Sequence, residues 1–330
     1  ILVGDIGGTN TRLLYADING AVCDSYIEHN YPSQDFNNLI DIINQFLLDF
    51  KISNSIDAAC FAIAGPVENG SVSVTNLPWV ISEEQLKSDL NTPDVILIND
   101  FFAVAIGISE LSEDDTLTLQ QAEGAITSPY TDIAVIGAGT GLGAAHLVWQ
   151  NAHYHAYSSE YGHTGFAPEN PLQTELLQWM QQKHSHVSLE MLLSGKGLTT
   201  IYHFLHEQKH YLESSSVQAK MKLNDAAEVI TEYALAETDP LCEATLATFI
   251  DIYGAAAGNL ALNYYPVAEL YIAGGIAAKI KDKMQGSSFI AAFKNKGLLS
   301  SKMKTITIKL ILQDKVGLYG ALTMLKRIYM

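Results

Sequence analysis

Residues 1–16 read ILVGDIGGTNTRLLYA, in which two apolar runs of β type flank a glycine-rich turn. Such runs on both sides of a tight turn predict strand, loop, strand. The same order returns at residues 132–149, DIAVIGAGTGLGAAHLVW, where an apolar run, a Gly and Thr turn and a second apolar run follow one another. Self-similarity of this kind predicts two related halves.

The rest of the chain alternates between predicted strands and predicted helices. In the first third we expect strands at 21–29, 58–64, 71–75 and 95–98, and helices at 35–50, 82–90 and 100–108. Residues 171–263 are expected to be mostly helical, with the polar stretch 207–222 as a loop. A strand at 270–273 enters Gly274-Gly275, and a strand at 305–312 leads into a helix at 316–328. This alternation predicts a mixed α/β protein.

Length and charge narrow the function classes. The chain has 330 residues, enough for two domains at roughly 100–200 residues each, with a cleft between them. Its 19 Lys and Arg against 36 Asp and Glu give a formal charge of −17, which disfavours nucleic acid and anionic membrane surfaces as partners. The longest uncharged apolar stretch, about 101–108, is far shorter than the roughly 20 residues of a membrane helix, so no span is predicted.

Cysteine and histidine usage suggests neither disulfides nor a metal cluster. Cys23, Cys60 and Cys242 are far apart and form no CxxC pair, which is typical of reduced thiols in a cytosol. Two HxH pairs occur, at 153–155 and 184–186, but no Cys or carboxylate pattern accompanies them. We therefore expect a cytoplasmic protein without a direct metal site.

Three glycine-rich turns at strand ends, at 4–10, 137–143 and 274–275, are the main functional signal. Glycine lets the backbone adopt positive φ and approach an anion, so that consecutive amides can converge on a phosphate. The alternative that each is an ordinary tight turn stays open, because glycine is favoured in turns of every kind.

Two familiar nucleotide motifs are matched only superficially. Residues 139–144 fit the dinucleotide fingerprint, with Glu160 near the place of its acid, but a helix must follow its glycines and 144–149 reads as a strand. Residues 194–197, SGKG, resemble part of a Walker loop without its earlier glycine or its following Ser or Thr. Both interpretations are rejected.

Polar candidates lie at strand ends and among apolar residues. Asn99-Asp100 follows an apolar strand and opens a helix, where Asp100 is either an N-cap, which the spacing alone favours, or a site carboxylate. The two roles are compatible, because amides at a helix start would keep the carboxylate ionised. Glu160, His163 and Glu190 are further candidates, although solvated glutamates and satisfied core histidines are individually more common. Asn76 beside Trp79 is a polar and flat apolar pair of the kind that sugar sites use.

The sequence resembles the bacterial-type glucokinases of the hexokinase and actin-like ATPase superfamily over nearly its whole length. The matching segments, in family order, are VGDIGGTNTR at 3–12, AIAGP at 62–66, TNLPW at 75–79, INDF at 98–101, GAGTGLG at 137–143, EYGH at 160–163, SLEMLLSG at 188–195 and IAGGI at 272–276. The resemblance implies a two-domain actin-like ATPase fold, related to ribonuclease H, with an interdomain cleft. The implied domains are a small one, 1–108 plus 312–330, and a large one, 109–311.

The resemblance also implies the activity and its residues. It implies phosphorylation of glucose at the 6-hydroxyl by ATP and Mg²⁺, feeding glycolysis, in a cytoplasmic homodimer, with domain closure hinged near 101–108 and 316–328. The implied base is Asp100, and the implied sugar ligands are Asn76, Asn99, Asp100, Glu160, His163 and Glu190. The implied nucleotide-binding residues are Asp5, Gly7, Gly8, Thr9, Asn10, Gly139, Thr140, Gly141, Gly274 and Gly275, with Asp5 reaching Mg²⁺ through bound water.

Two departures and two rivals accompany this prediction. Tyr161 stands where many relatives have a glycine, a difference that bears on the sugar pocket, and the cysteine-rich zinc motif of the related repressor and kinase branch is absent. One rival is a sugar-binding transcriptional regulator on the same scaffold, which the acidic charge and the start of the chain at its first strand disfavour. The other is a kinase for another hexose, or for mannose as well.

Overall fold

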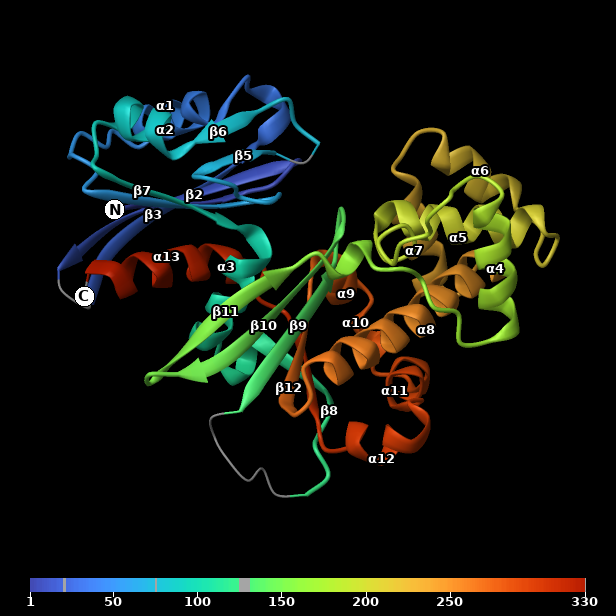
Figure 1. Cartoon of the computed structure of the whole chain (residues 1–330). Coiled ribbons are helices and arrows are strands. Elements are labelled where there is room, and N and C mark those ends of the chain that lie inside the picture. The colour runs from blue at the N-terminus through green and yellow to red at the C-terminus, as the bar shows by residue number, and fades with distance from the viewer. Residues whose placement is uncertain (20–21, 75, 125–130, 330) are drawn as a thin grey trace. The chain divides into compact units, whose positions relative to one another are not determined.

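The computed structural model describes residues 1–19, 22–74, 76–124 and 131–329, and it forms two compact units (Figure 1). Unit 1 comprises Ile1–Ser112, Tyr154–Ser158 and Gln313–Met330, and unit 2 comprises Glu113–His153 and Ser159–Leu312. The division expected from the sequence, 1–108 plus 312–330 against 109–311, stays a prediction. Residues 21 and 75, the expected limits of two strands, lie outside the described residues.

Unit 1 is built on a five-stranded sheet with the order β3-β2-β1-β4-β7. The strands are β1 (Leu2–Ile6), β2 (Asn10–Asn19), β3 (Val22–Pro32), β4 (Ala58–Ile63) and β7 (Asp94–Asn99). The first three strands are antiparallel neighbours, whereas β4 runs parallel to β1 and β7 parallel to β4. A two-stranded ribbon joins β5 (Ser71–Ser73) and β6 (Val80–Ser82). The glycine-rich turn after Ile6 is thus the β1–β2 connection, as predicted.

Helices cover both faces of this sheet (Figure 1). One face packs against α1 (Leu39–Asp49) and α2 (Glu83–Leu90), whose Phe46 and Leu86 join a core with Leu2 and Ile6. The other face packs against α3 (Asp100–Gly107) and α13 (Val316–Tyr329), where Val3 meets Leu318 in a second core.

The two helices α3 and α13 touch through their backbones. A Cβ added at Gly320 of α13 would lie 1.8 Å from the Ala103 carbonyl oxygen of α3. A Cβ added at Gly107 would lie 2.1 Å from the Val316 carbonyl oxygen. Only glycine permits this approach, so α3 and α13 are in close backbone contact inside unit 1.

Unit 2 repeats the topology of unit 1. Its six-stranded sheet has the order β11-β10-β9-β12-β13-β8, and its first five positions match the order of the unit 1 sheet. The strands are β8 (Thr116–Gln120), β9 (Asp132–Ala138), β10 (Leu142–Gln150), β11 (His153–Ser159), β12 (Val267–Ala273) and β13 (Thr307–Ile311). The edge strand β11 belongs to this sheet by its pairing, although its residues Tyr154–Ser158 are grouped with unit 1. Strand β10 is antiparallel to β9, β12 is parallel to β9 and β13 is parallel to β12, as in unit 1. The predicted relation between the two halves is confirmed, and β8 is an additional edge strand.

Most of the remaining chain of unit 2 is helical, as predicted for residues 171–263; the short helices from Gly275 to Met303 were not predicted. The helices are α4 (Pro171–Gln181), α5 (Gly195–Glu207), α6 (Ser215–Met221), α7 (Ala226–Leu235), α8 (Pro240–Asn263), α9 (Gly275–Lys279), α10 (Lys281–Met284), α11 (Ser287–Lys294) and α12 (Ser300–Met303). The prediction of a loop at 207–222 is wrong where α6 forms. There the Ser214 side chain caps the helix by accepting from the Val217 amide, and Val217 is buried.

Helix α8 is the one helix among the described residues that is long and apolar enough to cross a membrane by length and composition. Its 24 residues include a window of mean hydropathy 1.2, of which 78% is buried inside the molecule. The helix packs against α5, α7 and α11, so it is the central core helix of unit 2. The sequence prediction did not single out this helix, because Glu243, Asp251 and Asn259 divide its apolar residues into short runs.

Candidate active site

The parallel strands of unit 1 end together at one edge of the sheet. Ile6 is paired with Ile63, and Ile63 with Asn99, so the carboxyl ends of β1, β4 and β7 are in register. The glycine turn after β1 and Asp100 after β7 therefore leave the sheet at the same edge. This is the edge at which ligands of α/β proteins bind.

The first glycine turn is held by its own backbone and by one buried serine. The Gly7 amide donates to the Asn10 carbonyl at 2.8 Å, and the Ser33 hydroxyl donates to the Gly7 carbonyl at 2.8 Å. The Ser33 amide donates to the Thr9 carbonyl at 2.9 Å. Because the Gly7 amide is used within the turn, the amides that follow it, at Gly8 and Thr9, are the ones that could face a ligand.

The residue that caps α3 is Asn99, so the prediction of Asp100 as N-cap is wrong by one position. The Asn99 Oδ1 accepts from the amides of Phe101 and Phe102, at 3.0 and 3.1 Å. Its Nδ2 donates to the Gly65 carbonyl at 3.1 Å and to Asp100 Oδ1 at 3.0 Å. Asn99 thus fixes both the helix start and the orientation of the Asp100 carboxyl group.

The Asp100 carboxyl group is shifted toward its protonated form. Burial raises the pKa of Asp100 from 3.8 to about 7, and the nearby Asp5 carboxylate adds to the rise, although hydrogen bonds from Phe101 and Asn99 oppose it. Burial likewise raises the pKa of Asp5 to about 6, against the opposing charge of Arg12. The helix-start amide of Phe101 lowers the pKa of Asp100, as expected, but burial and the Asp5 charge outweigh it, so that Asp100 is not kept fully ionised at neutral pH. The resulting pKa lies close to neutral pH, which suits a group that exchanges protons.

The pairing of Asn76 with Trp79 as a sugar platform is not supported by the structure. Asn76 is exposed in a turn with φ of 65°, but Trp79 is only 3% exposed and lies in the core with Val72 and Ile81. A buried indole cannot stack on a ligand. Asn76 alone remains a candidate.

In unit 2 the second and third glycine turns meet at the corresponding sheet edge. Gly137 of β9 is paired with Ala273 of β12, and Gly274 follows with φ of 91°. A Cβ at Gly274 would lie 2.3 Å from the Ala138 carbonyl oxygen, so glycine is required there. At Gly139, by contrast, no described atom lies within 4 Å of the Cβ position, so that side of the turn is open. Strand β10 follows this turn directly, which bears out the rejection of the dinucleotide motif.

Three of the predicted sugar ligands also come together in unit 2. Glu160 precedes a single 3-10 turn, Tyr161–His163, and its Oε2 lies 3.7 Å from His163 Nε2, with both side chains exposed. The Glu190 amide donates to the Gly162 carbonyl at 2.9 Å, which places Glu190 beside this turn. The Glu190 Oε2 in turn accepts from the Leu142 amide, directly after the second glycine turn, at 2.9 Å.

The Tyr161 side chain points into the protein core. It is 8% exposed, and its hydroxyl donates to the Ala256 carbonyl of α8 at 2.8 Å. Its ring therefore anchors the Glu160–His163 segment from behind, and the effect of Tyr161 on the sugar pocket stays a prediction.

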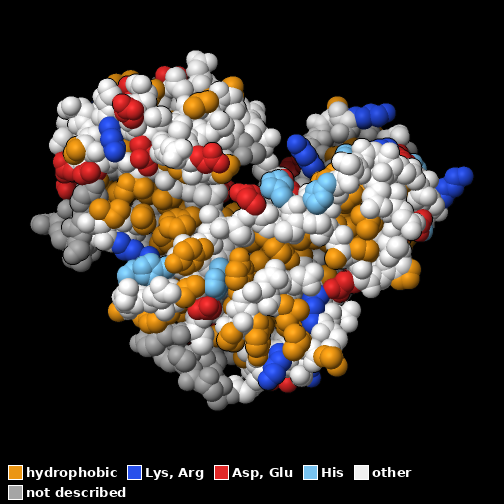
Figure 2. Space-filling view, viewed as in Figure 1, with side chains coloured by type: hydrophobic (Ala, Val, Ile, Leu, Met, Phe, Trp, Pro, Cys, Tyr) orange, Lys and Arg blue, Asp and Glu red, His pale blue; other side chains and the backbone are white. Residues whose placement is uncertain are grey.

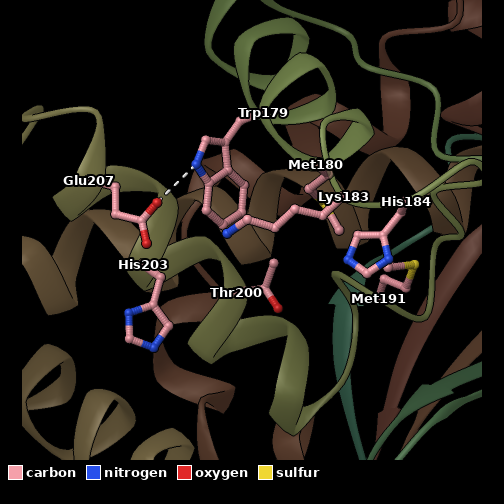
Figure 3. Close-up of a pocket in the computed structure, with 8 residues that line it drawn as sticks. All are labelled: Trp179, Met180, Lys183, His184, Met191, Thr200, His203 and Glu207. Atoms are coloured by element: carbon pink, nitrogen blue, oxygen red, sulfur yellow. Dashed lines mark hydrogen bonds between the residues drawn. The ribbon is translucent and has the colours of Figure 1, made fainter.

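Other candidate features are separate from these residues. A cavity of about 320 Å³ between α4 and α5 (Figure 3) is lined by Trp179, Met180, Lys183, His184, Met191, Thr200, His203 and Glu207, and includes none of the predicted site residues. Among the described residues no group of three or more His, Cys, Asp or Glu could hold a metal ion. Cys60 and Cys242 are buried free thiols. On the face shown in Figure 2, Lys and Arg side chains are scattered.

A repeated five-strand topology, with a glycine turn after the first strand of each unit, defines the class of actin-like ATPase folds to which sugar kinases belong. The glucokinase family model matches residues 2–328. A glucokinase of Trichormus variabilis is 41% identical over 97% of this chain and 97% of its own length. The chain belongs to the glucokinase family, and it is accordingly a kinase enzyme.

Solved structures agree with this assignment. The glucokinase of an Antarctic psychrotroph is 32% identical, with a TM-score of 0.81 over 99% of this chain and 98% of that one. A ROK family glucokinase from Streptomyces griseus, solved in complex with glucose and AMPPNP, shares the fold at 18% identity, with a TM-score of 0.61 over 98% of each chain.

Proposed function

We propose that this enzyme transfers the γ-phosphoryl group of ATP to the 6-hydroxyl of glucose, with Asp100 as the general base, giving glucose 6-phosphate and ADP. The observation that carries the proposal is the Asp100 carboxyl group, which Asn99 orients at the carboxyl end of β7 and whose pKa lies near 7. A carboxyl group with this pKa is about half ionised at neutral pH, so it is available as a base, and it is basic enough to bind the proton that it accepts.

In this mechanism the 6-hydroxyl oxygen of glucose loses its proton and gains the phosphoryl group. Asp100 accepts the proton of the 6-hydroxyl as that oxygen forms its bond to the γ-phosphorus. The bond between the γ-phosphorus and the bridging oxygen breaks, ADP leaves, and Asp100 later releases the proton to water. Positioning and charge stabilisation supply most of the acceleration in reactions of this class.

Sugar recognition is assigned to six side chains. The proposed ligands are Asn76, Asn99, Asp100, Glu160, His163 and Glu190. Carboxylates and a histidine that bind hydroxyl groups discriminate strongly against analogues that lack them. The exposure of Glu160 and His163, 72% and 64% of their side chains, supports this role because both are available to a ligand.

Nucleotide binding is assigned to the glycine turns. The Gly7 and Gly139 amides are used inside their turns, each at 2.8 Å, so the proposed phosphate donors are the amides of Gly8, Thr9, Thr140 and Gly141. The open space at Gly139 and Gly275 supports this assignment, since a ligand can approach the backbone there. Asn10 and Gly274 complete the proposed set.

The residues of unit 1 fit a magnesium ion held through water. Asp5 offers carboxylate oxygens, the donors that Mg²⁺ prefers, and its charge raises the pKa of Asp100, a repulsion that a cation would relieve. When bound, Mg²⁺ neutralises charge on the phosphate oxygens. We further propose a cytoplasmic enzyme that acts as a homodimer and feeds glycolysis.

The experiment that tests the proposal measures ADP release with glucose, mannose, fructose and N-acetylglucosamine in parallel. We expect turnover to be fastest with glucose. Equal or faster turnover with another hexose would contradict the proposal that glucose is the preferred substrate. Release of ADP that does not depend on any sugar would refute the kinase mechanism.

A further inference from the structure

Three segments that are far apart in the sequence meet at Leu142. The Leu142 amide donates to Glu190 Oε2 at 2.9 Å, and a Cβ at Gly162 would lie 2.2 Å from the Leu142 carbonyl oxygen. The Glu190 amide donates to the Gly162 carbonyl at 2.9 Å. The end of the second glycine turn, the Glu160–His163 segment and Glu190 are therefore packed against one another without space between them.

The glycine turn itself is shaped around the Glu190 carboxylate. A Cβ at Gly141 would lie 2.5 Å from Glu190 Oε2, so only glycine leaves the carboxylate in place. Gly139, two residues earlier in the same turn, has no described atom within 4 Å of its Cβ position. The two glycines of one turn thus differ in what they contact: Gly141 accommodates Glu190, and Gly139 faces open space.

A second connection ties the same turn to the segment after Glu190. The Gly195 amide donates to the Gly139 carbonyl at 3.0 Å, and the Ser194 hydroxyl donates to the Glu190 carbonyl at 2.8 Å while capping α5. The turn is therefore held at both ends by residues 190–195. A shift of Glu190 therefore also shifts the second glycine turn.

We propose that Glu190 is a positioning residue for the phosphate-binding turn, so that the sugar site and the phosphate site are coupled through its carboxylate. The inference rests on the proposed function, in which Glu190 binds glucose and residues 139–141 bind phosphate. When glucose binds Glu190, it holds the carboxylate in place, and the carboxylate in turn holds the Leu142 amide. Conversely, a change in the turn that displaces Glu190 weakens glucose binding even when no nucleotide is present.

The test compares Gly141→Ala with Gly139→Ala, by titrating each variant with glucose in the absence of nucleotide. We expect Gly141→Ala to weaken glucose binding about 10-fold or more, the order of a lost hydrogen bond to a charged group. Gly139→Ala is expected to leave glucose affinity within about 2-fold of wild type, since its Cβ meets nothing. Equal glucose affinity of both variants would overturn the coupling.

Substitutions of Glu190 itself separate this inference from the proposed function. Glu190→Gln keeps an oxygen that can accept from the Leu142 amide, so glucose binding weakens but the KM for ATP stays within about 3-fold of wild type. Glu190→Ala loses both roles, and the KM for ATP rises about 10-fold or more. If Glu190→Ala leaves glucose affinity unchanged, the sugar role in the proposed function fails. If it weakens glucose but leaves the KM for ATP unchanged, only the coupling fails.

Discussion

Replacing Asp100 by asparagine tests the electrostatics of the site through stability. Asparagine keeps an oxygen that can accept from the Phe101 amide and from Asn99, as Asp100 Oδ1 does now, but it carries no charge. The folded pKa of Asp100, about 7, lies above the unfolded value of 3.8. The folded chain therefore binds an extra proton between these values, and wild-type stability falls as pH rises from about 4 to about 7.

The folded and unfolded pKa values of Asp100 also give the size of this loss of stability. A difference of about three pKa units lowers the free energy of unfolding by at most about 4 kcal/mol, and this loss is complete above pH 7 and absent below pH 4. Asp100→Asn is thus expected to be more stable than wild type at pH 8 by up to that amount, and equally stable at pH 4.

Urea unfolding of both proteins at several pH values between 4 and 8, followed by circular dichroism, measures this difference. Asp17→Asn, which removes an exposed carboxylate on β2, is the matched control for losing one negative charge. A stability difference between Asp100→Asn and wild type that does not change with pH would refute the reasoning, because burial of the carboxylate would then carry no cost.

Further predictions concern activity and packing. Asp100→Ala is expected to lower kcat by about 10²–10⁴ with little effect on the KM for ATP, and near-wild-type turnover would remove Asp100 from the mechanism. Because the base must be ionised to accept a proton, kcat/KM for glucose is expected to fall as pH drops below about 7; a flat profile from pH 5 to 8 would contradict this. Glu160→Gln or His163→Ala should raise the KM for glucose more than that for ATP, whereas an equal rise would indicate misfolding. Gly320→Ala, whose Cβ would lie 1.8 Å from a carbonyl oxygen of α3, should destabilise the protein by about 1–3 kcal/mol in thermal unfolding, and Gly165→Ala, with its nearest atom at 3.8 Å, should not.

The local order of strand, glycine turn and strand could be read from the sequence because it depends on neighbouring residues. The same holds for the strand-to-helix junction at Asn99, which was placed correctly to within one residue. The repeat of the whole topology followed from the second occurrence of the same pattern. These features are set by short-range backbone preferences, which a single sequence displays.

Features that depend on distant residues were predicted less well. Trp79 and Tyr161 both stand beside polar residues, and only the packing of the core shows that their rings are buried. The direction of the Asp100 pKa shift depends on burial and on Asp5 from another strand, which the local helix-start argument could not include. The contact of Glu190 with Leu142 likewise joins segments that no spacing rule relates.

The backbone contact between α3 and α13 has a consequence for synthesis of the protein. Unit 1 contains both β1 and α13, and most of the residues of unit 2 come between these two elements in the sequence. Chains emerge from the ribosome N-terminal end first, and domains generally fold as units when their residues are available. Unit 1, which carries Asp100, therefore reaches its final packing only after residues 316–329 have been released, although its sheet is made first. Helix α13, which is synthesised after unit 2, therefore completes the packing around α3, the helix that begins at Asp100.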